Sequence, residues 1–535
     1  MMDLSTLVSA LQNPEIYPEH PGKVDFVQTH ISAIFLTGEH AYKVKKPVDF
    51  GFLDFTTLEK RKYYCEQEVV LNRRLCPEIY LGVVEIRLHQ GRILLGEGPG
   101  EVVEYAVLMK QLPQDCMMDR WLSRGAITPV HLHKIAAKLA HFHAQADTNS
   151  EIASYGTIDT IRQNLEENFS QTERYLGLSI AAEFFREIKE NAHRFLQNQL
   201  PLFNQRLATG KIRDCHGDLH LQHICLTEEI LIFDCIEFNQ RFRYSDVAAD
   251  IAFLLMDLDF HGYPFFSAAL GFAYLRISQD WALYLLLDFY KSYRAYVRGK
   301  VISFRLDDPA ISATEKGCAL RDARRYFQWA HHYARRLNRP AFFITCGLMG
   351  TGKSTIARAL AEALGWQRLR SDVLRKELAH LSPQQHRYEN FHQGLYSPDF
   401  SRQTYQVLLE QARHILHAGF SLIIDASFKK QMDRQQARAL AHQAGGDFLL
   451  IECQLPEDEV QRRLAQRVSD QDEPSDGRWE LFAAQKEDFD KVEEMSPEAH
   501  LTLKTEGSVE DCLGAIFRHL LRRAGREGPG PLDEK

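Results

Sequence analysis

Residues 341–364 read AFFITCGLMGTGKSTIARALAEAL, and this stretch decides the fold of the second half of the chain. The apolar run Ala341–Cys346 has the length of a buried strand, and the apolar residues after Ser354 recur at helical spacing. The glycine-rich segment between them fits G-x-x-x-x-G-K-[ST], whose backbone N–H groups turn inward around a phosphate. A strand before the loop and a helix after it separate this motif from a chance glycine turn. We therefore predict a nucleoside triphosphate site here.

The loop supplies the residues that we expect to bind the phosphates. They are, in chain order, Gly347, Leu348, Met349, Gly350, Thr351, Gly352, Lys353, Ser354 and Thr355. The following helix directs its positive N-terminal end at the same anion. Lys353 can neutralise charge on the β- and γ-phosphates, which also makes it a candidate catalytic residue, and the Ser354 hydroxyl can ligate Mg²⁺.

Length, charge and cysteine usage limit the class of protein. A chain of 535 residues is longer than one core usually supports, so we expect two or three domains. The net charge of -8 argues against a partner that is mainly nucleic acid or anionic membrane, although a local basic groove stays open. Ten scattered cysteines without metal spacing, and a start without a signal peptide pattern, favour the cytoplasm. Charged residues interrupt the most apolar stretch, Ala268–Tyr290, so we expect no membrane span.

The first part of the chain alternates strand patterns with one helix. Val24–Leu36 and Ala41–Val44 flank a glycine turn and are typical of a hairpin, and Thr57–Leu75 is typical of a helix. Three further strand patterns follow, at Val83–Leu88, Arg92–Leu95 and Val102–Met109. This order predicts a small α+β lobe over about residues 20–112, followed by a mainly helical lobe over about 113–338.

A pair of aspartates lies on either side of a second hairpin. Ile224–Leu226 and Ile230–Phe233 are short strand patterns joined by a polar turn. The hairpin brings Asp218, before the first strand, close to Asp234, after the second. Two carboxylates at one end of a hairpin suit phosphoryl transfer, in which one accepts a proton and the other holds Mg²⁺. Taken alone, the pair is more simply explained as solvated loop acids.

The order of the parts favours the first explanation. A strand lysine, a helix glutamate, a hinge-like segment at Lys110–Leu112, then H-x-D and a strand-end aspartate repeat the order of parts in protein kinases. The segment His216–His220, HGDLH, resembles the aminoglycoside phosphotransferase and choline kinase branch of kinase-like folds, and the resemblance covers roughly residues 20–330. It implies that Asp218 is the catalytic base and Asp234 the main Mg²⁺ ligand, with the backbone of the hinge-like segment against the nucleotide base.

The same resemblance implies a nucleotide-binding pair and reveals two departures. Lys43 would hold the α- and β-phosphates and Glu68 would orient it, but Lys45 points to the same face of its strand and can fill the role instead. The family pattern places an asparagine metal ligand where this chain has His223, whose nitrogen suits Mg²⁺ poorly. The phosphate-clamping loop Leu36–Glu39 has a single glycine. An active kinase and a nucleotide-binding, regulatory domain are therefore both open.

A change in pattern marks the domain boundary. Ile311–Leu337 reads as one long helix, and a basic segment separates it from the P-loop strand. We predict the following domains: a kinase-like domain over 1–338, a P-loop domain over 339–523 and a disordered tail over 524–535.

Strands and helices alternate after the P-loop. Gln367–Arg370, Phe420–Ile424 and Phe448–Cys453 are strand patterns separated by helical ones, which predicts a doubly wound parallel sheet with ligands at the strand carboxyl ends. Asp372 and Asp425 follow two of these strands. Asp372 is placed to take a proton from an acceptor hydroxyl and Asp425 to hold Mg²⁺, although either alone is more often a solvated strand-end acid.

Two arginines precede a polar segment that has the character of a lid. Arg463 and Arg467 lie four residues apart on one face of the helical pattern Glu457–Arg467, and polar residues 468–477 follow. Arginines that close over the transferring phosphoryl group stabilise its charge and exclude water. A salt-bridged surface helix explains the pair equally well.

The second half also resembles a known group of enzymes. Ser371, Asp372 and Arg375, together with the segment Asp425–Phe428, match the pattern of the small P-loop kinases of the gluconate kinase, polynucleotide kinase and zeta-toxin group. The resemblance covers roughly residues 340–520 and implies a kinase active site at the P-loop. The fold class that follows is a bilobal protein-kinase-like α+β domain followed by a P-loop α/β domain.

Two sets of residues are interpreted as structural. Four histidines follow a helical pattern without a carboxylate at metal spacing, and we interpret them as a polar helix face: His131, His133, His141 and His143. Three cysteines near the first candidate site are interpreted as small core residues: Cys215, Cys225 and Cys235.

Two function hypotheses follow. The favoured one is a cytoplasmic phosphotransferase that uses ATP and Mg²⁺ and phosphorylates a hydroxyl of a small molecule of the sugar or amino-sugar type. The other is a nucleotide-gated regulatory protein that phosphorylates no small molecule. Asp372 and the arginine pair separate the two, because a pure switch needs no acceptor base. The acceptor depends on the shape of the pocket and not on a motif.

Overall fold

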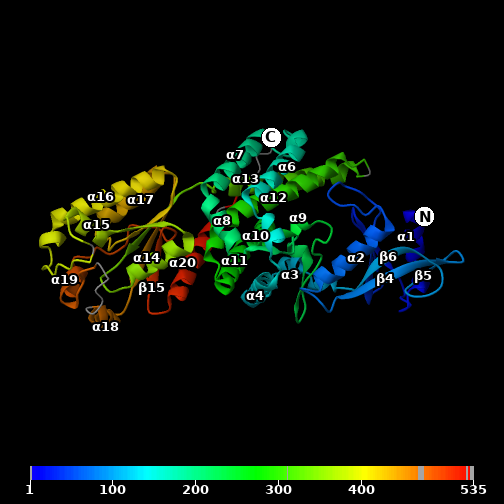
Figure 1. Cartoon of the computed structure of the whole chain (residues 1–535), viewed down its shortest axis with the longest axis horizontal. Helices are drawn as coiled ribbons and strands as arrows, with labels where there is room; N and C mark the ends of the chain where they lie inside the picture. The colour runs from blue at the N-terminus through cyan, green and yellow to red at the C-terminus, as the bar shows by residue number, and fades with distance from the viewer. Residues whose placement is uncertain (1–2, 310, 383, 468–474, 526–527, 530–535) are drawn as a thin grey trace. The chain divides into compact units, whose positions relative to one another are not determined.

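The computed structural model describes residues 3–309, 311–382, 384–467, 475–525 and 528–529 (Figure 1). Their contacts group into two compact units. Unit 1 consists of Met1–Ala182, Leu196–Ser278 and Tyr290–Ala330, and unit 2 consists of Glu183–Phe195, Gln279–Phe289 and His331–Lys535. Two short segments of the first half thus group with the P-loop unit, and the cut expected near residue 338 stays a prediction.

Unit 1 begins with a six-stranded antiparallel sheet in the order β1-β2-β3-β6-β4-β5. Its strands are β1 (Asp25–Gln28), β2 (Ser32–Leu36), β3 (His40–Lys45), β4 (Tyr80–His89), β5 (Arg92–Leu95) and β6 (Glu101–Lys110), and its helices are α1 (Leu4–Leu11) and α2 (Leu58–Asn72). The predicted hairpin, helix and later strands are confirmed. One strand pattern, Val24–Leu36, is corrected to two strands, because the chain reverses after Gln28 and pairs β1 antiparallel with β2.

The two faces of this sheet bury different side chains. Tyr42 and Val44 of β3 lie in an apolar cluster with Leu7 of α1. Because side chains alternate along a strand, Lys43 and Lys45 point to the opposite face. That face packs against α2, whose buried side chains form a second cluster with those of β4 and β6. The alternation therefore aims both lysines at the buried side of α2.

The rest of the first half is mainly helical. Its helices are α3 (Met118–Ser123), α4 (Pro129–Gln145), α5 (Ser150–Ser154), α6 (Ile158–Thr172), α7 (Ala182–Asn198), α8 (Leu200–Ala208), α9 (Gln240–Arg243), α10 (Val247–Phe260), α11 (Pro264–Ser278), α12 (Leu287–Phe304) and α13 (Ala313–Ala334). Every residue of α10 is buried, as expected for a helix that is packed on all sides. No helix within the described residues is long and apolar enough to cross a membrane.

Two short ladders position the segment that carries the paired aspartates. The predicted hairpin is confirmed as β8 (Ile224–Leu226) paired antiparallel with β9 (Ile230–Ile232). A second ladder, β7 (Ile212–Asp214) with β10 (Tyr244–Asp246), has no counterpart in the sequence-based predictions. The loops between these strands place Asp218 and Asp234 beside each other.

Unit 2 is built on a five-stranded parallel sheet in the order β12-β13-β11-β14-β15. Its strands are β11 (Ala341–Cys346), β12 (Gln367–Arg370), β13 (Leu422–Asp425), β14 (Asp447–Gln454) and β15 (His500–Lys504). Its helices after residue 350 are α14 (Lys353–Leu364), α15 (Ser371–Leu378), α16 (Pro398–His417), α17 (Gln431–Gln443), α18 (Glu457–Arg467), α19 (Phe482–Glu487) and α20 (Val509–Ala524). The predicted parallel sheet is confirmed, and the sequence-based predictions missed β15 and α20.

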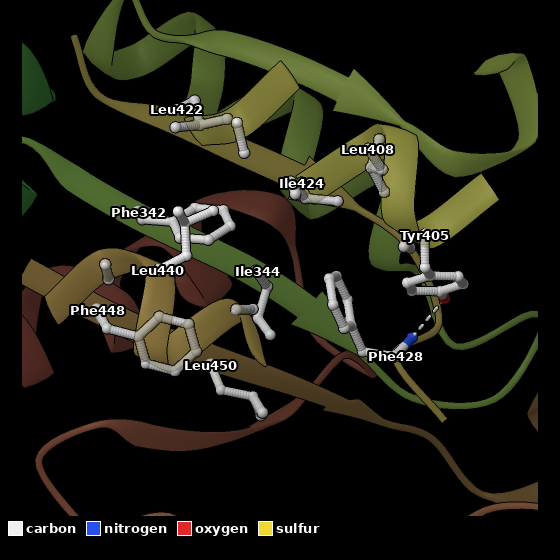
Figure 2. Packing of buried hydrophobic residues seen from close by; sticks show 14 of the residues in the cluster. Phe342, Ile344, Tyr405, Leu408, Leu422, Ile424, Phe428, Leu440, Phe448 and Leu450 are labelled. Atoms are coloured by element: carbon white, nitrogen blue, oxygen red, sulfur yellow. Dashed lines mark hydrogen bonds between the residues drawn. The ribbon is translucent and has the colours of Figure 1, made fainter. Parts of the chain in front are cut away.

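A close-packed core fixes the strands that carry the P-loop and Asp425. Figure 2 shows Ile424 of β13 extending towards Leu408 of α16, with Ile344 of β11 in the same apolar cluster, and all three side chains are fully buried. Each such side chain stabilises the fold by about 1.5–3 kcal/mol relative to exposure. Just after β13, the Phe428 N–H donates a 3.1 Å hydrogen bond to the Tyr405 hydroxyl. The strand ends that carry the candidate site are therefore held by the core beneath them.

Candidate functional site

The P-loop connects β11 to α14 through a turn that only glycine can make. Gly347 has φ +130°, and a Cβ there would lie 2.5 Å from the carbonyl oxygen of Cys453. Gly350 has φ +75°, and a Cβ there would lie 2.9 Å from the Val460 side chain. Neither neighbour can move without displacing β14 or α18. The two glycines therefore keep the loop close to the sheet edge, with its backbone N–H groups free of side-chain bulk.

Lys353, the first residue of α14, lies over the loop that it follows. Its ammonium donates a 2.6 Å hydrogen bond to the carbonyl oxygen of Leu348. Burial lowers the pKa of Lys353. A second loop contact holds the backbone, since the Met349 N–H donates 2.8 Å to Gln485 Oε1. The lysine is thus placed among the loop groups expected to surround a phosphate, and Gln485 is a contact that no motif indicated.

Ser354 and Asp425 bring two oxygen ligands together. The Ser354 hydroxyl donates a 3.0 Å hydrogen bond to Asp425 Oδ1 at the end of β13. Asp425 Oδ2 is buried and accepts no hydrogen bond within the described residues, and Arg370 Nε stands 3.4 Å from it. Burial, then the charge of Asp372, raises the pKa of Asp425 despite Arg370. An unsatisfied carboxylate oxygen beside a hydroxyl is a donor set that fits Mg²⁺.

A pocket of about 860 Å³ joins the predicted residues of the P-loop domain. Its wall includes Lys353, Ser354, Asp372, Asp425 and Arg463. Asp372 is the second residue of α15, directly after β12, and is partly exposed. The parallel sheet gathers these side chains because the carboxyl ends of its strands share one edge.

The far wall of this pocket carries Arg375, which belongs to the sequence pattern named above, together with Tyr396 and Asp476, which the sequence did not indicate. Arg375 donates 2.6 Å to the Leu395 carbonyl oxygen, and its guanidinium lies 4.9 Å from the centre of the Tyr396 ring. The Tyr396 hydroxyl donates 3.0 Å to Asp476 Oδ2. Asp476 is itself buried beside Lys376, whose ammonium lies 3.5 Å from Oδ1. These partners lie up to a hundred residues apart in the chain and have no repeating spacing. The sequence therefore could not predict that they contact one another.

The predicted arginine pair is described only in part. Arg463 lines the pocket, and its guanidinium donates 2.7 Å to the Thr505 carbonyl oxygen. Arg467 ends α18, and its side chain lies outside the described residues, as do residues 468–474 of the expected lid. The last lid residues, Ser475–Gly477, line the pocket. Of the expected tail, 526–527 and 530–535 also lie outside the described residues.

In unit 1, Lys43 connects the small lobe to the paired aspartates. Its ammonium lies 2.7 Å from Glu68 Oε1 and 2.6 Å from Asp234 Oδ1. Burial lowers the pKa of Lys43, whereas the charges of Asp234 and Glu68 raise it. The resulting pKa lies well above the ordinary value for lysine. Glu68 is completely buried on α2. The strand lysine, the helix glutamate and the strand-end aspartate therefore form one chain of ion pairs.

Lys45 shares Glu68 but has a different second partner. Its ammonium lies 2.7 Å from Glu68 Oε2 and is also paired with Glu237, which no motif indicated. Its side chain is 1% exposed, against 11% for Lys43. Among the contacts of the two lysines within the described residues, only that of Lys43 reaches Asp234. This placement supports Lys43 over Lys45 as the residue that faces a nucleotide.

Asp250 holds the backbone of the His216–His220 segment. Its two carboxylate oxygens accept hydrogen bonds of 2.9 Å from the N–H groups of His216 and Gly217. Its Oδ2 also lies 3.2 Å from His143 Nε2. The interpretation of His143 as part of a polar helix face is therefore wrong, because this residue is buried and Asp250, distant in the sequence, supplies the carboxylate. The pair fixes the loop that presents Asp218.

His223 stands between the two predicted carboxylates. Its Nε2 lies 3.4 Å from Asp234 Oδ2, and its Nδ1 lies 3.8 Å from Asp218 Oδ2. His220 Nε2 lies 3.5 Å from the same Asp218 oxygen. Burial lowers the pKa of His223 to about 4. Burial raises the pKa of Asp218, whereas His220 lowers it. The resulting pKa lies well below the ordinary value for aspartate.

The three cysteines near this site are buried. Burial raises the pKa of Cys225 to about 11 and that of Cys235 to about 12, so both thiols stay protonated at neutral pH. Burial also raises the pKa of Cys215 well above its ordinary value. These thiols have the surroundings of inert core residues.

Comparison with family models divides the chain in the same two parts. Residues 88–287 match the model of the Phosphotransferase enzyme family, and residues 342–492 match that of an AAA domain. The resemblance to an aminoglycoside phosphotransferase-type domain followed by a P-loop kinase-type domain is therefore confirmed.

Solved structures similar to each part were also found. A gluconokinase from Sinorhizobium meliloti is 17% identical and covers 35% of this chain and 94% of its own, with a TM-score of 0.26. A choline/ethanolamine kinase family protein from Mesorhizobium loti is 13% identical and covers 61% of this chain and 98% of its own, with a TM-score of 0.35. An APS kinase of Mycobacterium tuberculosis is 19% identical over 34% of this chain and 98% of its own, with a TM-score of 0.26.

Two curated relatives match nearly the whole chain. The uncharacterized protein Rv2004c of Mycobacterium tuberculosis and the uncharacterized protein Mb2027c of Mycobacterium bovis are each 30% identical over 470 residues, which is 87% of this chain and 91% of theirs. A match of that extent includes both domains. The chain therefore belongs to the same family as these mycobacterial proteins, and in this chain a phosphotransferase-type domain is joined to a P-loop kinase-type domain.

Proposed function

We propose that this protein is an ATP- and Mg²⁺-dependent phosphotransferase that acts on a hydroxyl of a small molecule, with the P-loop site as its active site. The observation that carries the proposal is the composition of one pocket. A phosphate loop, an oxygen donor pair and a strand-end carboxylate all line it. Kinase-type domains in both halves of the chain support phosphoryl transfer as the reaction class.

The roles follow from the placement of the side chains. Lys353 and the loop N–H groups would bind the nucleotide phosphates, and Ser354 and Asp425 would hold Mg²⁺. When bound, Mg²⁺ neutralises the charge that develops on the phosphate oxygens. Asp372 would accept the proton of the acceptor hydroxyl as its oxygen bonds to the γ-phosphorus and ADP leaves. Arg463 and Arg467 are proposed to stabilise the transferring group.

The far wall of the pocket supports an acceptor that is rich in oxygen atoms. Arg375 Nε and Arg478 Nη1 are buried nitrogen atoms without a hydrogen-bond partner within the described residues, and both residues line the pocket. An unsatisfied buried donor costs about 1–3 kcal/mol, which a ligand oxygen can recover. A sugar or amino-sugar offers several such oxygens. We propose a small acceptor of this kind and a cytoplasmic site of action, with no role for nucleic acid or membrane.

The second candidate function is a nucleotide-gated regulatory protein. It is favoured by one observation in unit 1, where Lys43 is already engaged by both Glu68 and Asp234 and His223 replaces the expected asparagine. On this alternative, ATP would bind without transfer to a small molecule. The polar far wall of the P-loop pocket favours the enzyme, because a switch has no use for an acceptor site.

The test is a screen of the purified full chain for acceptor-stimulated ADP release. A panel of sugars, amino-sugars, aminoglycosides and nucleosides is incubated with ATP and Mg²⁺, and mass spectrometry is used to find an acceptor that gains one phosphoryl group. We expect stimulation by a polyhydroxylated acceptor in the wild type and its loss in Asp372→Asn. Tight ATP binding without stimulation by any acceptor would favour the regulatory alternative.

A further inference from the structure

The His223 ring has a fixed tautomer. Its Nδ1 lies 2.9 Å from the backbone carbonyl oxygen of Asp218. A carbonyl oxygen can only accept a hydrogen bond, so Nδ1 carries the proton. In the neutral ring, Nε2 is then an acceptor with a free lone pair. Asp234 Oδ2 lies 3.4 Å from this Nε2, so two electron-rich atoms stand close together.

The contact between these two atoms is longer than a charge-assisted hydrogen bond. Charge-assisted N–H···O bonds have lengths of about 2.7–2.9 Å, and the 3.4 Å separation exceeds that range. The nearest cation, the Lys43 ammonium, binds the other oxygen of Asp234, Oδ1, at 2.6 Å. Oδ2 is therefore left for a partner that also satisfies the His223 nitrogen.

The separation equals that of two ligands of one metal ion. Nitrogen and oxygen ligands of Zn²⁺ lie at about 2.0–2.2 Å, and at a tetrahedral angle two such ligands stand roughly 3.4 Å apart. Further donors lie close to the His223 ring, because one ligand atom each of Asp218, His220 and His223 lie within 4.8 Å of one another, although this group does not include Asp234. Three of these four side chains come from residues 218–223, and the fourth, Asp234, follows the last residue of β9 by two positions.

The donor set does not suit Mg²⁺. That ion prefers six oxygen ligands in an octahedral arrangement and keeps several waters, whereas imidazole nitrogen suits Zn²⁺ and its neighbours in the first transition row. The asparagine expected from the family pattern would have offered a neutral oxygen in place of the ring nitrogen. The replacement by His223 thus changes the class of ion that the site selects.

We propose that the kinase-like domain binds a divalent transition-metal ion of the Zn²⁺ type, in place of Mg²⁺, through His223 Nε2 and Asp234 Oδ2, with Asp218 and His220 as further ligands. Because all of these ligands are protein side chains, the ion binds without nucleotide. Mg²⁺ at a phosphoryl-transfer site depends in part on substrate phosphates. The proposal concerns unit 1 alone and holds whether or not the P-loop domain phosphorylates an acceptor.

The test measures metal binding directly on the nucleotide-free full chain. Protein stripped with a chelator is titrated with Zn²⁺, Co²⁺ or Mg²⁺ by isothermal calorimetry, and the melting temperature is recorded with each ion. We expect one equivalent of Zn²⁺ or Co²⁺ to bind and raise the melting temperature, and Mg²⁺ to do neither. His223→Asn should weaken Zn²⁺ binding by at least about tenfold, since even the loss of a group that supports a ligand costs about 10–100-fold.

Two further variants make the outcome decisive. His133→Asn is the matched control, because His133 is exposed on α4, and its Zn²⁺ affinity should equal that of the wild type. Asp234→Asn removes the second proposed ligand. It tests Zn²⁺ binding independently if His223→Asn fails to fold, as judged by loss of its far-ultraviolet circular dichroism. Zn²⁺ affinity that survives in His223→Asn and in Asp234→Asn would overturn the proposal. So would nucleotide-free binding of Mg²⁺ as tight as that of Zn²⁺.

Discussion

The Ser354 hydroxyl donates a 3.0 Å hydrogen bond to Asp425 Oδ1, and this contact joins the first turn of α14 to the end of β13. Asp425 ends a strand that the apolar core of unit 2 holds (Figure 2), and Ser354 lies on α14, whose Ile356, Ala357 and Leu360 are buried. The two oxygen atoms that we propose as Mg²⁺ ligands therefore stand in place before any ligand binds. A preorganised pair of this kind loses little freedom on binding, which is how rigid scaffolds make metal and phosphate sites effective.

Loss of the serine hydroxyl should act through the metal. In Ser354→Ala, ATP-dependent turnover should need roughly 10–100-fold more Mg²⁺ for half-maximal rate, because one oxygen ligand is gone while the P-loop backbone is unchanged. A Mg²⁺ titration of ADP release measures the change. Ser354→Thr serves as the control, since its hydroxyl can replace that of serine and should restore the wild-type titration. An identical Mg²⁺ requirement in Ser354→Ala would remove this residue from the metal site.

Loss of the proposed base should separate binding from transfer. Asp372→Asn should cut acceptor phosphorylation by roughly two to four orders of magnitude, the usual contribution of a general base. ATP affinity should stay near that of the wild type, because Asp372 lies on the acceptor side of the pocket. Calorimetry of ATP binding beside the transfer assay separates the two effects. If ATP binding collapses as well, Asp372 has a metal-binding or structural role.

The buried carboxylate of Asp425 should cost stability at neutral pH. Burial raises its pKa, so the folded protein holds this proton more tightly than the unfolded chain. The resulting stability is complete below the ordinary pKa and is lost as pH rises through the folded-state pKa. Asp425→Asn avoids this loss, and without ligands its melting temperature at pH 7.5 should exceed that of the wild type by roughly 2–4 °C, the effect of about 1 kcal/mol.

The control for the Asp425 prediction is the same comparison in acid. Well below the ordinary pKa, the wild-type carboxyl is protonated in both states, and the two melting temperatures should converge. A constant difference at all pH values would show that the change acts through packing and not through charge. A lower melting temperature for Asp425→Asn at pH 7.5 would contradict the prediction.

The two lysines of β3 should have different effects when removed. Lys45→Ala leaves Glu237 buried without its partner and should destabilise unit 1 by about 3–5 kcal/mol, measured by urea unfolding. Lys43→Ala should cost less, because Glu68 keeps Lys45 and the Asp234 side chain is 39% exposed. In a Lys353→Ala background, Lys43→Ala should instead lower the remaining ATP affinity. The reverse pattern would assign the nucleotide role to Lys45.

Most of the correct predictions came from patterns within short stretches of the sequence. The P-loop lies within one strand–turn–helix unit, and the β8–β9 hairpin brings Asp218 to Asp234 over a short stretch of chain. The alternation of β3 placed Lys43 and Lys45 on one face, and the sequence could not choose between them. The choice depends on Asp234, which lies 191 residues from Lys43 in the chain.

The missed features are long-range pairings of polar residues. His143 reaches Asp250 over 107 residues, and Tyr396 reaches Asp476 over 80. A single polar residue in a helical or loop pattern looks like a solvated one until the fold buries it with a partner. The strand β15 was missed for a related reason, because it joins the sheet at its edge after a long irregular segment.

The most direct test of the central claim is the rate of acceptor-stimulated ADP release by the full-length Lys353→Ala protein. The account predicts a fall of at least about 100-fold, because the only described side chain that offers positive charge from within the P-loop is lost, with an unchanged melting temperature. Lys491→Ala, at an exposed position of the same unit, is the matched control and should keep the wild-type rate. A Lys353→Ala protein that releases ADP at the wild-type rate would contradict the assignment of the P-loop as the active site.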